Sequence, residues 1–252
     1  MTEEKIPKKS VVAKKIRKRR LLLILLIIAA VVSLCLFTPL FGITSITVKN
    51  NQVIDNDSII RASGIKVGEN VFRVNLSSAE KAVEKLGHVE KAVVKRKFPS
   101  RILIEVTESN IAAYIMFAGN YVAIDINGKV IDVIKTGDIK ADKPVVTGIA
   151  LKSFDKGEVF TASKAKKGKF VTELLLSLKK NELLVDVKKI DISNVNSAKM
   201  ILNTETTVVV GDSSQLDYKM AYLIEVLKNL DNLRGGEIDL SDTKNVIYKG
   251  GK

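Results

Sequence analysis

The 252-residue sequence predicts an α+β protein in three parts. An N-terminal transmembrane helix comes first, a small domain of order strand–helix–helix–strand–strand follows, and a larger, mostly antiparallel β-domain with flanking helices comes last. Three observations predict this order: an uncharged apolar run over residues 21–41, strand-like alternation around two helical stretches over 42–109, and short apolar runs separated by turn residues over 110–240.

The apolar run, LLLILLIIAAVVSLCLFTPLF, contains no charged side chain. At about 1.5 Å per helical residue it is long enough to cross a hydrocarbon core of roughly 30 Å. A cleaved signal peptide is the alternative, but its apolar region is usually only about 7–15 residues long and ends in small residues. We therefore predict an uncleaved anchor at 21–41. Cys35, the only cysteine, lies inside this run, so the domains that follow are predicted to have neither a disulfide nor a thiol ligand.

Positive charge is concentrated before the anchor. Residues 1–20 hold nine Lys and Arg side chains against two glutamates, and the next basic residue is Lys49. Because basic residues flank the cytoplasmic end of a span, we predict a cytoplasmic basic tail and an extracytoplasmic C-terminal part, the arrangement of a single-pass type II protein. This explains the basic N-terminal run without a nucleic-acid partner, and the remainder of the chain is only mildly basic.

Residues 42–109 predict the small domain. The alternation of residues 43–49 favours a strand, and Asp55 or Asn56 is placed to cap a short helix that Gly64 ends.

A second helix is predicted over 77–86, because its apolar residues fall on one stripe and Ser77 with Glu80 fits a capping box. Phe72, in the linker between the helices, is a candidate buried anchor.

The stretch HVEKAVVKRKFPSRILIEVTES, residues 88–109, predicts a hairpin with a three-residue Pro-Ser-Arg turn. This register leaves the lysines on the solvent face, but it places Arg96 on the apolar face. Arg96 is expected to extend to water or to find a carboxylate. The predicted cross-strand pairs are Phe98 with Ile102, Arg96 with Ile104, Val94 with Val106 and Ala92 with Glu108.

Residues 110–240 predict the larger domain. Asn127-Gly128 fits a type I′ hairpin turn that pairs Ile124 with Ile131 and Val122 with Val133. Two amphipathic helices are predicted, with inward residues in the segments KFVTELLLSLKKN and SQLDYKMAYLIEVLKNL. The polar segment 151–169 is predicted to be an exposed loop, and residues 241–252 a C-terminal strand or tail.

The segments ITVKNNQVIDNDSIIRASGIKVGENVFRVN and VEKAVVKRKFPSRILIEVTE, following an anchor, resemble the POTRA domain of the FtsQ/DivIB family of bacterial cell-division proteins. GEIDL, residues 236–240, is similar to the end of that family's β-domain. The chain departs from the family pattern at Ser109 and Ile111, where the family usually has arginine and proline after the glutamate.

The resemblance implies a bitopic scaffold of the divisome at the division septum of the cell membrane. It implies binding to FtsL-like and FtsB/DivIC-like bitopic partners and to the septal peptidoglycan synthase complex. Through these partners the protein would help to recruit and regulate septal peptidoglycan synthesis. It also implies that the last part of the β-domain carries the partner-binding edge, which an exposed terminal strand can form by strand addition. In this sequence the implied edge consists of Ile238, Asp239, Leu240, Asn245, Val246, Ile247 and Tyr248.

The sequence offers no constellation for catalysis, a metal or a cofactor, and predicts no small-molecule substrate. His88 is the only histidine, and the Asp pairs 55/57 and 239/242 fit capping and turn roles. Two other classes remain as alternatives. A POTRA-bearing export or assembly factor would usually carry repeated domains, and a cell-wall enzyme would need converging acid, base or nucleophilic groups.

Overall fold

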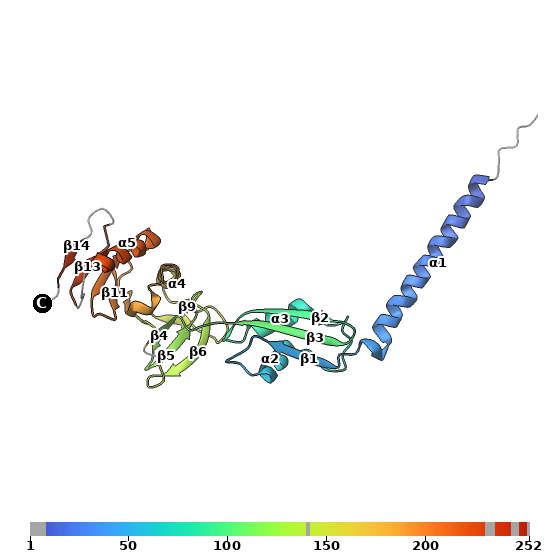
Figure 1. Cartoon of the computed structure of the whole chain (residues 1–252), viewed down its shortest axis with the longest axis horizontal. Helices are drawn as coiled ribbons and strands as arrows, with labels where there is room; N and C mark the ends of the chain where they lie inside the picture. The colour runs from blue at the N-terminus through green and yellow to red at the C-terminus, as the bar shows by residue number, and fades with distance from the viewer. Residues whose placement is uncertain (1–8, 140–141, 230–234, 243–246, 251–252) are drawn as a thin grey trace, which may run out of the picture.

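The computed structural model describes residues 9–139, 142–229, 235–242 and 247–250 (Figure 1). Its first element is the helix α1 (Lys9–Phe37), which projects away from the folded part, and the 3-10 turn η1 (Pro39–Phe41) follows. The predicted apolar segment 21–41 is therefore not one continuous helix. Pro39 cannot continue an α-helix, and the Thr38 hydroxyl donates to the carbonyl of Leu34 at 2.7 Å where the helix ends. Within the described residues, no helix is long and apolar enough to cross a membrane.

The small domain has the predicted element order. It consists of β1 (Ser45–Lys49), α2 (Asn56–Ser63), α3 (Leu76–Glu84), β2 (Val89–Lys97) and β3 (Arg101–Glu108). β3 lies in the middle of a three-stranded sheet, parallel to β1 and antiparallel to β2. The two helices cover one face of this sheet and enclose a core that includes Ile59, Val83, Val94 and Ile104.

Helix capping in this domain is partly as predicted. The Asp55 carboxylate accepts a hydrogen bond from the Ser58 amide at 2.8 Å, and Gly64 ends α2 in the left-handed conformation. The predicted capping box of α3 is wrong, because the cap is Asn75. Glu80 instead accepts from the Val94 amide at 2.9 Å, which ties α3 to the sheet.

The β2–β3 hairpin corrects the predicted register by two residues. Lys97 pairs with Arg101 and Arg96 with Ile102, so the turn consists of Phe98, Pro99 and Ser100. Because side chains alternate with a period of two, this shift leaves every residue on its predicted face.

Arg96 makes neither of the two expected contacts. Its guanidinium donates to the carbonyls of Val71 and Val74 at 2.8 and 2.7 Å, and so closes the loop between the helices. Phe72 in that loop is 38% exposed, so it is not the buried anchor that the sequence predicted.

The larger domain is built on a nine-stranded sheet of order β14-β13-β12-β11-β10-β7-β4-β5-β6. The pairs β7–β10, β4–β7 and β12–β13 are parallel and the other neighbouring pairs are antiparallel. Its strands are β4 (Ala113–Phe117), β5 (Asn120–Ile124), β6 (Val130–Lys135), β7 (Val145–Thr147), β10 (Val187–Asp191), β11 (Ala198–Leu202), β12 (Thr207–Gly211), β13 (Glu237–Asp239) and β14 (Ile247–Lys249).

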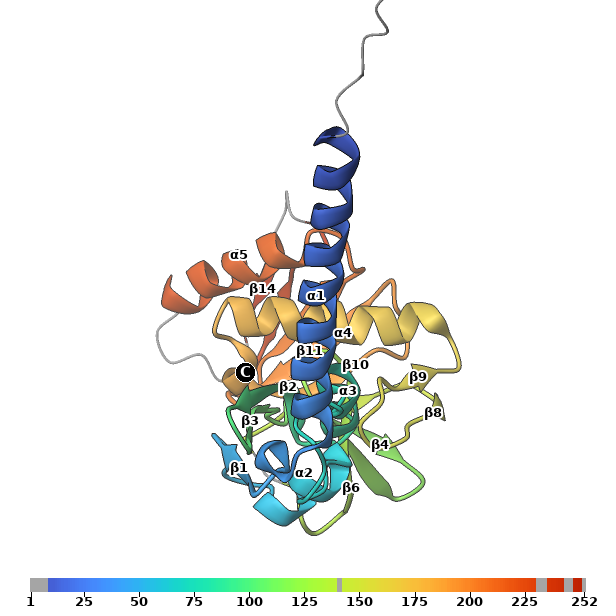
Figure 2. The ribbon, with the colours of Figure 1, turned by 90° about the vertical axis from the view of Figure 1, so that its right-hand side faces the viewer.

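Two helices, α4 (Ala165–Lys180) and α5 (Leu216–Asn229), lie on the same face of this sheet (Figure 2). The predicted inward residues of α4 are all buried: Phe170, Leu174, Leu175 and Leu178. In α5, Leu216, Met220 and Leu223 are buried as predicted, Ile224 and Leu227 are half-buried, and Leu230 lies outside the described residues. One continuous core therefore joins both helices to the sheet.

The predicted hairpin of this domain is only partly correct. The hairpin at Asn127-Gly128 is not type I′, because Gly128 has a positive φ and Asn127 does not. Instead the Asp125 carboxylate accepts from the amides of Asn127 and Lys129, each at 2.8 Å, and Ile124 pairs with Val130 rather than Ile131. Val122 pairs with Val133 as predicted.

The segment 151–169 is not an exposed loop. It forms the two-stranded sheet of β8 (Leu151–Ser153) and β9 (Thr161–Ala162) and then the start of α4. Its apolar residues Leu151, Phe160 and Ala162 are buried in the main core, which the polar composition of the segment concealed.

The two domains meet at the C-terminal turn of α3. The Lys129 ammonium donates to the carbonyls of Glu84 and Val89 in the first domain. A Cβ on Gly87 would lie 2.1 Å from the Ile131 carbonyl oxygen, and one on Gly157 would lie 1.7 Å from that of Lys85. Backbone therefore packs directly on backbone at this joint, and only glycine fits at either position.

Candidate partner-binding edge

The nine-stranded sheet ends in β14, whose three residues, Ile247, Tyr248 and Lys249, are all exposed. β14 pairs with β13 on one side, with Tyr248 opposite Ile238 and Ile247 opposite Asp239. Among the described strands none lies on its other side. The backbone on that side is therefore available for pairing with an added strand.

The structure separates the residues that the sequence grouped as one edge. Ile238 and Leu240 are buried in the core, and Asp239 between them is half-buried. Ile247 and Tyr248 are 51% and 40% exposed, and Asn245 and Val246 lie outside the described residues. Side-chain contact with a partner is thus open to Ile247 and Tyr248, whereas Ile238 and Leu240 fix β13 to the core.

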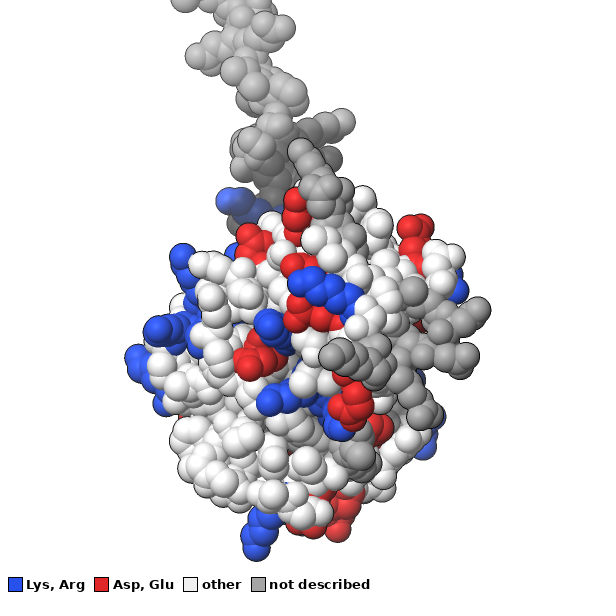
Figure 3. Space-filling view, turned by 90° about the vertical axis from the view of Figure 1, so that its left-hand side faces the viewer, with Lys and Arg blue, Asp and Glu red and all other residues white. Residues whose placement is uncertain are grey.

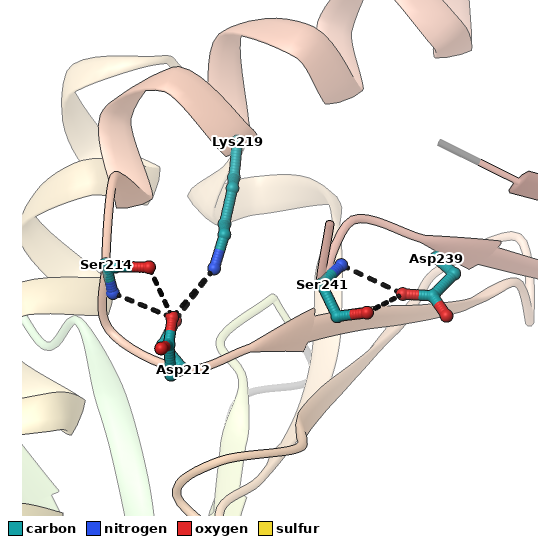
Figure 4. Close-up of polar contacts among 5 residues, drawn as sticks. All are labelled: Asp212, Ser214, Lys219, Asp239 and Ser241. Carbon is teal, nitrogen blue, oxygen red and sulfur yellow. Dashed lines mark hydrogen bonds and ion pairs between the residues drawn. The ribbon is translucent and has the colours of Figure 1, made fainter. Parts of the chain in front are cut away.

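Turns of the form Asp-x-Ser support the strand ends behind this edge (Figure 4). After β12, the Asp212 carboxylate accepts from the Ser214 amide and hydroxyl at 3.0 and 2.5 Å. At the end of β13, the Asp239 carboxylate accepts from the Ser241 amide and hydroxyl at 2.8 and 2.6 Å. Both carboxylates therefore serve the backbone, as expected of aspartate in local turns.

Lys219 of α5 is a buried charge that sequence reasoning missed. Its ammonium donates to the Asp212 carboxylate at 3.2 Å and to the Asp212 carbonyl at 3.1 Å, while the side chain is 1% exposed. The pKa of Asp212 is lowered to about 2 from its usual 3.8. The main cause is hydrogen bonding from the Ser214 hydroxyl and amide, followed by Lys219. The signal was present in the sequence, since Lys219 lies three residues after Leu216 on the apolar stripe of α5.

The end of the molecule that carries β14 shows no large area of a single charge sign (Figure 3). Basic and acidic side chains are interspersed among neutral atoms there. One ion pair, 3.8 Å long, links Lys199 of β11 to Glu237 of β13. Mixed charge around a short strand edge is compatible with backbone pairing to a specific partner.

Titratable groups elsewhere have structural roles. A cavity of about 490 Å³ beside the domain joint is lined by Asp125 and Ser109, but that aspartate is engaged by the hairpin amides and by the Ser109 hydroxyl at 3.4 Å. Burial, and then Lys156, lower the pKa of His88. In the part of the chain that the structure covers, no three His, Cys, Asp or Glu side chains are grouped to hold a metal ion.

Comparisons with known proteins agree with this two-domain organisation. Residues 41–109 match the FtsQ-type POTRA domain, and residues 113–241 match the C-terminal domain of the cell-division proteins FtsQ and DivIB. The cell-division protein DivIB of Clostridium tetani is 30% identical over 222 residues, which cover 87% of this chain and 81% of that protein. The cell-division protein FtsQ of Corynebacterium glutamicum is 36% identical over 93 residues, which cover 37% of this chain and 42% of that protein.

A solved structure, the major extracytoplasmic domain of DivIB from Geobacillus stearothermophilus, aligns with 50% of this chain and 96% of that chain. The identity is 16% and the TM-score is 0.34. The two family matches and the C. tetani relative cover both domains, in the order in which the structure shows them. The chain belongs to the FtsQ/DivIB family of cell-division proteins.

Proposed function

We propose that this cell-division protein is a non-catalytic, membrane-anchored scaffold that recruits bitopic partners through the edge strand β14. The observation that carries the proposal is the position of β14 at one end of the nine-stranded sheet, with all three residues exposed. Strand addition to such an edge gives affinity through backbone hydrogen bonds, while Ile247 and Tyr248 supply side-chain contacts.

The proposed partners are of the FtsL and FtsB/DivIC type, and their binding recruits and regulates septal peptidoglycan synthesis. An extended segment of such a partner would continue the sheet beyond β14. The predicted site residues Ile238, Asp239 and Leu240 hold the strand behind it, and the predicted Asn245 and Val246 precede β14 directly in the chain.

The proposed anchor is the apolar part of α1 and η1. The side chains of Leu21 to Leu26 are each more than half exposed, and so is Phe37 at the end of the helix. Exposed apolar side chains on all sides of a helix are costly in water and favourable in a lipid bilayer. With the basic N-terminus cytoplasmic, both folded domains lie outside the cell membrane, at the septum.

The test uses matched substitutions at the two opposite ends of one sheet. Ile247→Asp introduces a charge on β14, and Val133→Asp introduces the same charge on β6, where the exposure of 50% nearly equals the 51% of Ile247. The readout is co-purification of FtsL-like and DivIC-like proteins with the tagged full-length chain from dividing cells. We expect loss of the partners only with Ile247→Asp; retention by this variant, with unchanged thermal unfolding, would refute the proposed edge.

A further inference from the structure

Three aromatic side chains gather at one end of the POTRA domain: Phe72 and Phe98 are exposed, and Phe41 is half-buried against the core. The rings of Phe41 and Phe72 are 5.1 Å apart, and those of Phe72 and Phe98 are 5.4 Å apart. They come from η1, from the loop between α2 and α3, and from the β2–β3 turn, three segments far apart in the sequence. Phe98 is 58% exposed, whereas large aromatic side chains are usually mostly buried.

This aromatic end adjoins the end of α1. The Arg73 guanidinium lies over the Phe37 ring at 5.2 Å, and the Thr44 amide donates to the Ser100 carbonyl at 2.8 Å. Figure 1 shows the β2–β3 turn beside the point where α1 meets the domain. Only Thr38 separates α1 from η1, so this end of the domain stays next to the apolar helix.

Basic residues are common in the segments that carry the aromatic rings. Segments 37–45, 64–74 and 97–101 contain four basic residues, Lys66, Arg73, Lys97 and Arg101, all exposed, and a single acidic residue, Glu69. The opposite end of β1 has a different character. There the Glu108 carboxylate accepts from the amides of Gln52, Val53 and Ile54, each at 3.0 Å, and Asp55 and Asp57 are exposed.

The length of the apolar helix brings the same end to the membrane surface. The apolar residues of α1, Leu21 to Phe37, rise only about 25 Å, whereas a hydrocarbon core is about 30 Å thick. The bilayer surface therefore extends to η1, where Leu40 is 64% exposed. Aromatic rings favour the membrane–water interface, and nearby basic side chains are attracted to anionic headgroups.

We propose that the aromatic end of the POTRA domain docks onto the outer surface of an anionic lipid bilayer, with Phe72 and Phe98 inserted among the headgroups. Docking would fix the orientation of both folded domains relative to the membrane, because the joint at Lys129 holds the domains together. This inference rests on the proposed membrane anchor.

The chain contains no tryptophan, so each introduced tryptophan is a single fluorescent reporter. Three full-length variants are reconstituted into vesicles of phosphatidylcholine and phosphatidylglycerol whose acyl chains are brominated near the headgroup. Phe98→Trp reports docking, Val53→Trp reports the opposite end of the domain at 67% exposure, and Leu26→Trp reports the anchor. Circular dichroism before reconstitution establishes that each variant is folded.

We expect a blue shift and bromine quenching for Phe98→Trp and Leu26→Trp, and neither for Val53→Trp. Adding Lys97→Glu and Arg101→Glu to Phe98→Trp should reduce its quenching, whereas Lys81→Glu and Lys91→Glu, both away from this end, should not. Quenching of Leu26→Trp without quenching of Phe98→Trp overturns the docking alone, and no quenching of Leu26→Trp overturns the anchor and the docking together. The Phe98→Trp fluorescence could also shift to the blue without bromine quenching, and lose this shift when the protein is diluted. That result would mean contact between copies of the chain, and it would also overturn lipid docking.

Discussion

Lys219 lies almost fully buried beneath the last strands of the sheet, with its ammonium 3.2 Å from the carboxylate of Asp212, which stays exposed. A Cβ on Gly211 would lie 3.0 Å from Ser241 and 3.7 Å from the Lys219 nitrogen. The pair joins the loop after β12 to the start of α5, and Gly211 beside it packs closely against the turn after β13. We expect the strand behind the proposed partner edge to depend on this contact.

Replacing the carboxylate of this pair should destabilise the larger domain. Asp212→Asn removes the negative charge and leaves the Lys219 ammonium buried, which we expect to lower the free energy of unfolding by about 2 kcal/mol. Denaturant unfolding followed by circular dichroism measures the change. Lys219→Met is the matched control, because an apolar side chain of similar length needs no counter-ion and should cost much less. An equal loss in both variants would contradict this account.

Acid should destabilise the protein through the same carboxylate. The folded-state pKa of Asp212 is about 2, below its usual 3.8, chiefly because of the Ser214 hydroxyl and amide and then Lys219. Folding thus favours the ionised form, and its stabilising contribution is complete above about pH 5 and is lost as the pH falls through the folded pKa. Thermal unfolding measured from pH 5 to pH 2 should show a smaller pH dependence in Asp212→Asn. An identical profile would rule out this role.

Arg96 should stabilise the POTRA domain by fixing the loop that carries Phe72. Arg96→Ala leaves the carbonyls of Val71 and Val74 without their donor, and we expect a loss of about 2–3 kcal/mol in the free energy of unfolding. Lys97→Ala, on the exposed face of the same strand, should change it by less than about 0.5 kcal/mol. Arg96→Lys should recover only part of the loss, because an ammonium lacks the planar fork of the guanidinium.

Lys129 should keep the two folded domains in a fixed orientation. Lys129→Met removes the donor to the Glu84 and Val89 carbonyls while keeping most of the side-chain volume. Spin labels at Lys81→Cys and Lys169→Cys, in a Cys35→Ser background, report the interdomain distance by pulsed electron resonance. We expect a broader distance distribution for Lys129→Met and an unchanged one for Lys135→Met, an exposed lysine of β6. No broadening in Lys129→Met would show that the glycine contacts alone fix the joint.

Local chemistry made part of the fold predictable. The bounds of α2 were predictable because Asp55 accepts from an amide of its first turn and Gly64 ends it in the left-handed conformation, both local effects. The period-two alternation of β2 and β3 assigned their side chains to the correct faces. The hairpin register was misassigned by two residues because alternation does not distinguish shifts of two. The recurring Asp-x-Ser pattern at 191–193, 212–214 and 239–241 could have located three turns directly.

The sequence by itself determined the family, the order of elements in the POTRA domain and the apolar stripes of α4 and α5, because these follow from neighbours along the chain. Only the tertiary structure decided where Arg96 and Lys219 donate, which residues of the proposed edge are exposed, and which aromatic rings meet beside α1. Their partners lie on other elements: Arg96 reaches back 25 and 22 residues to its carbonyls. Contacts of this kind depend on how separate segments pack, and no periodicity along the sequence encodes them.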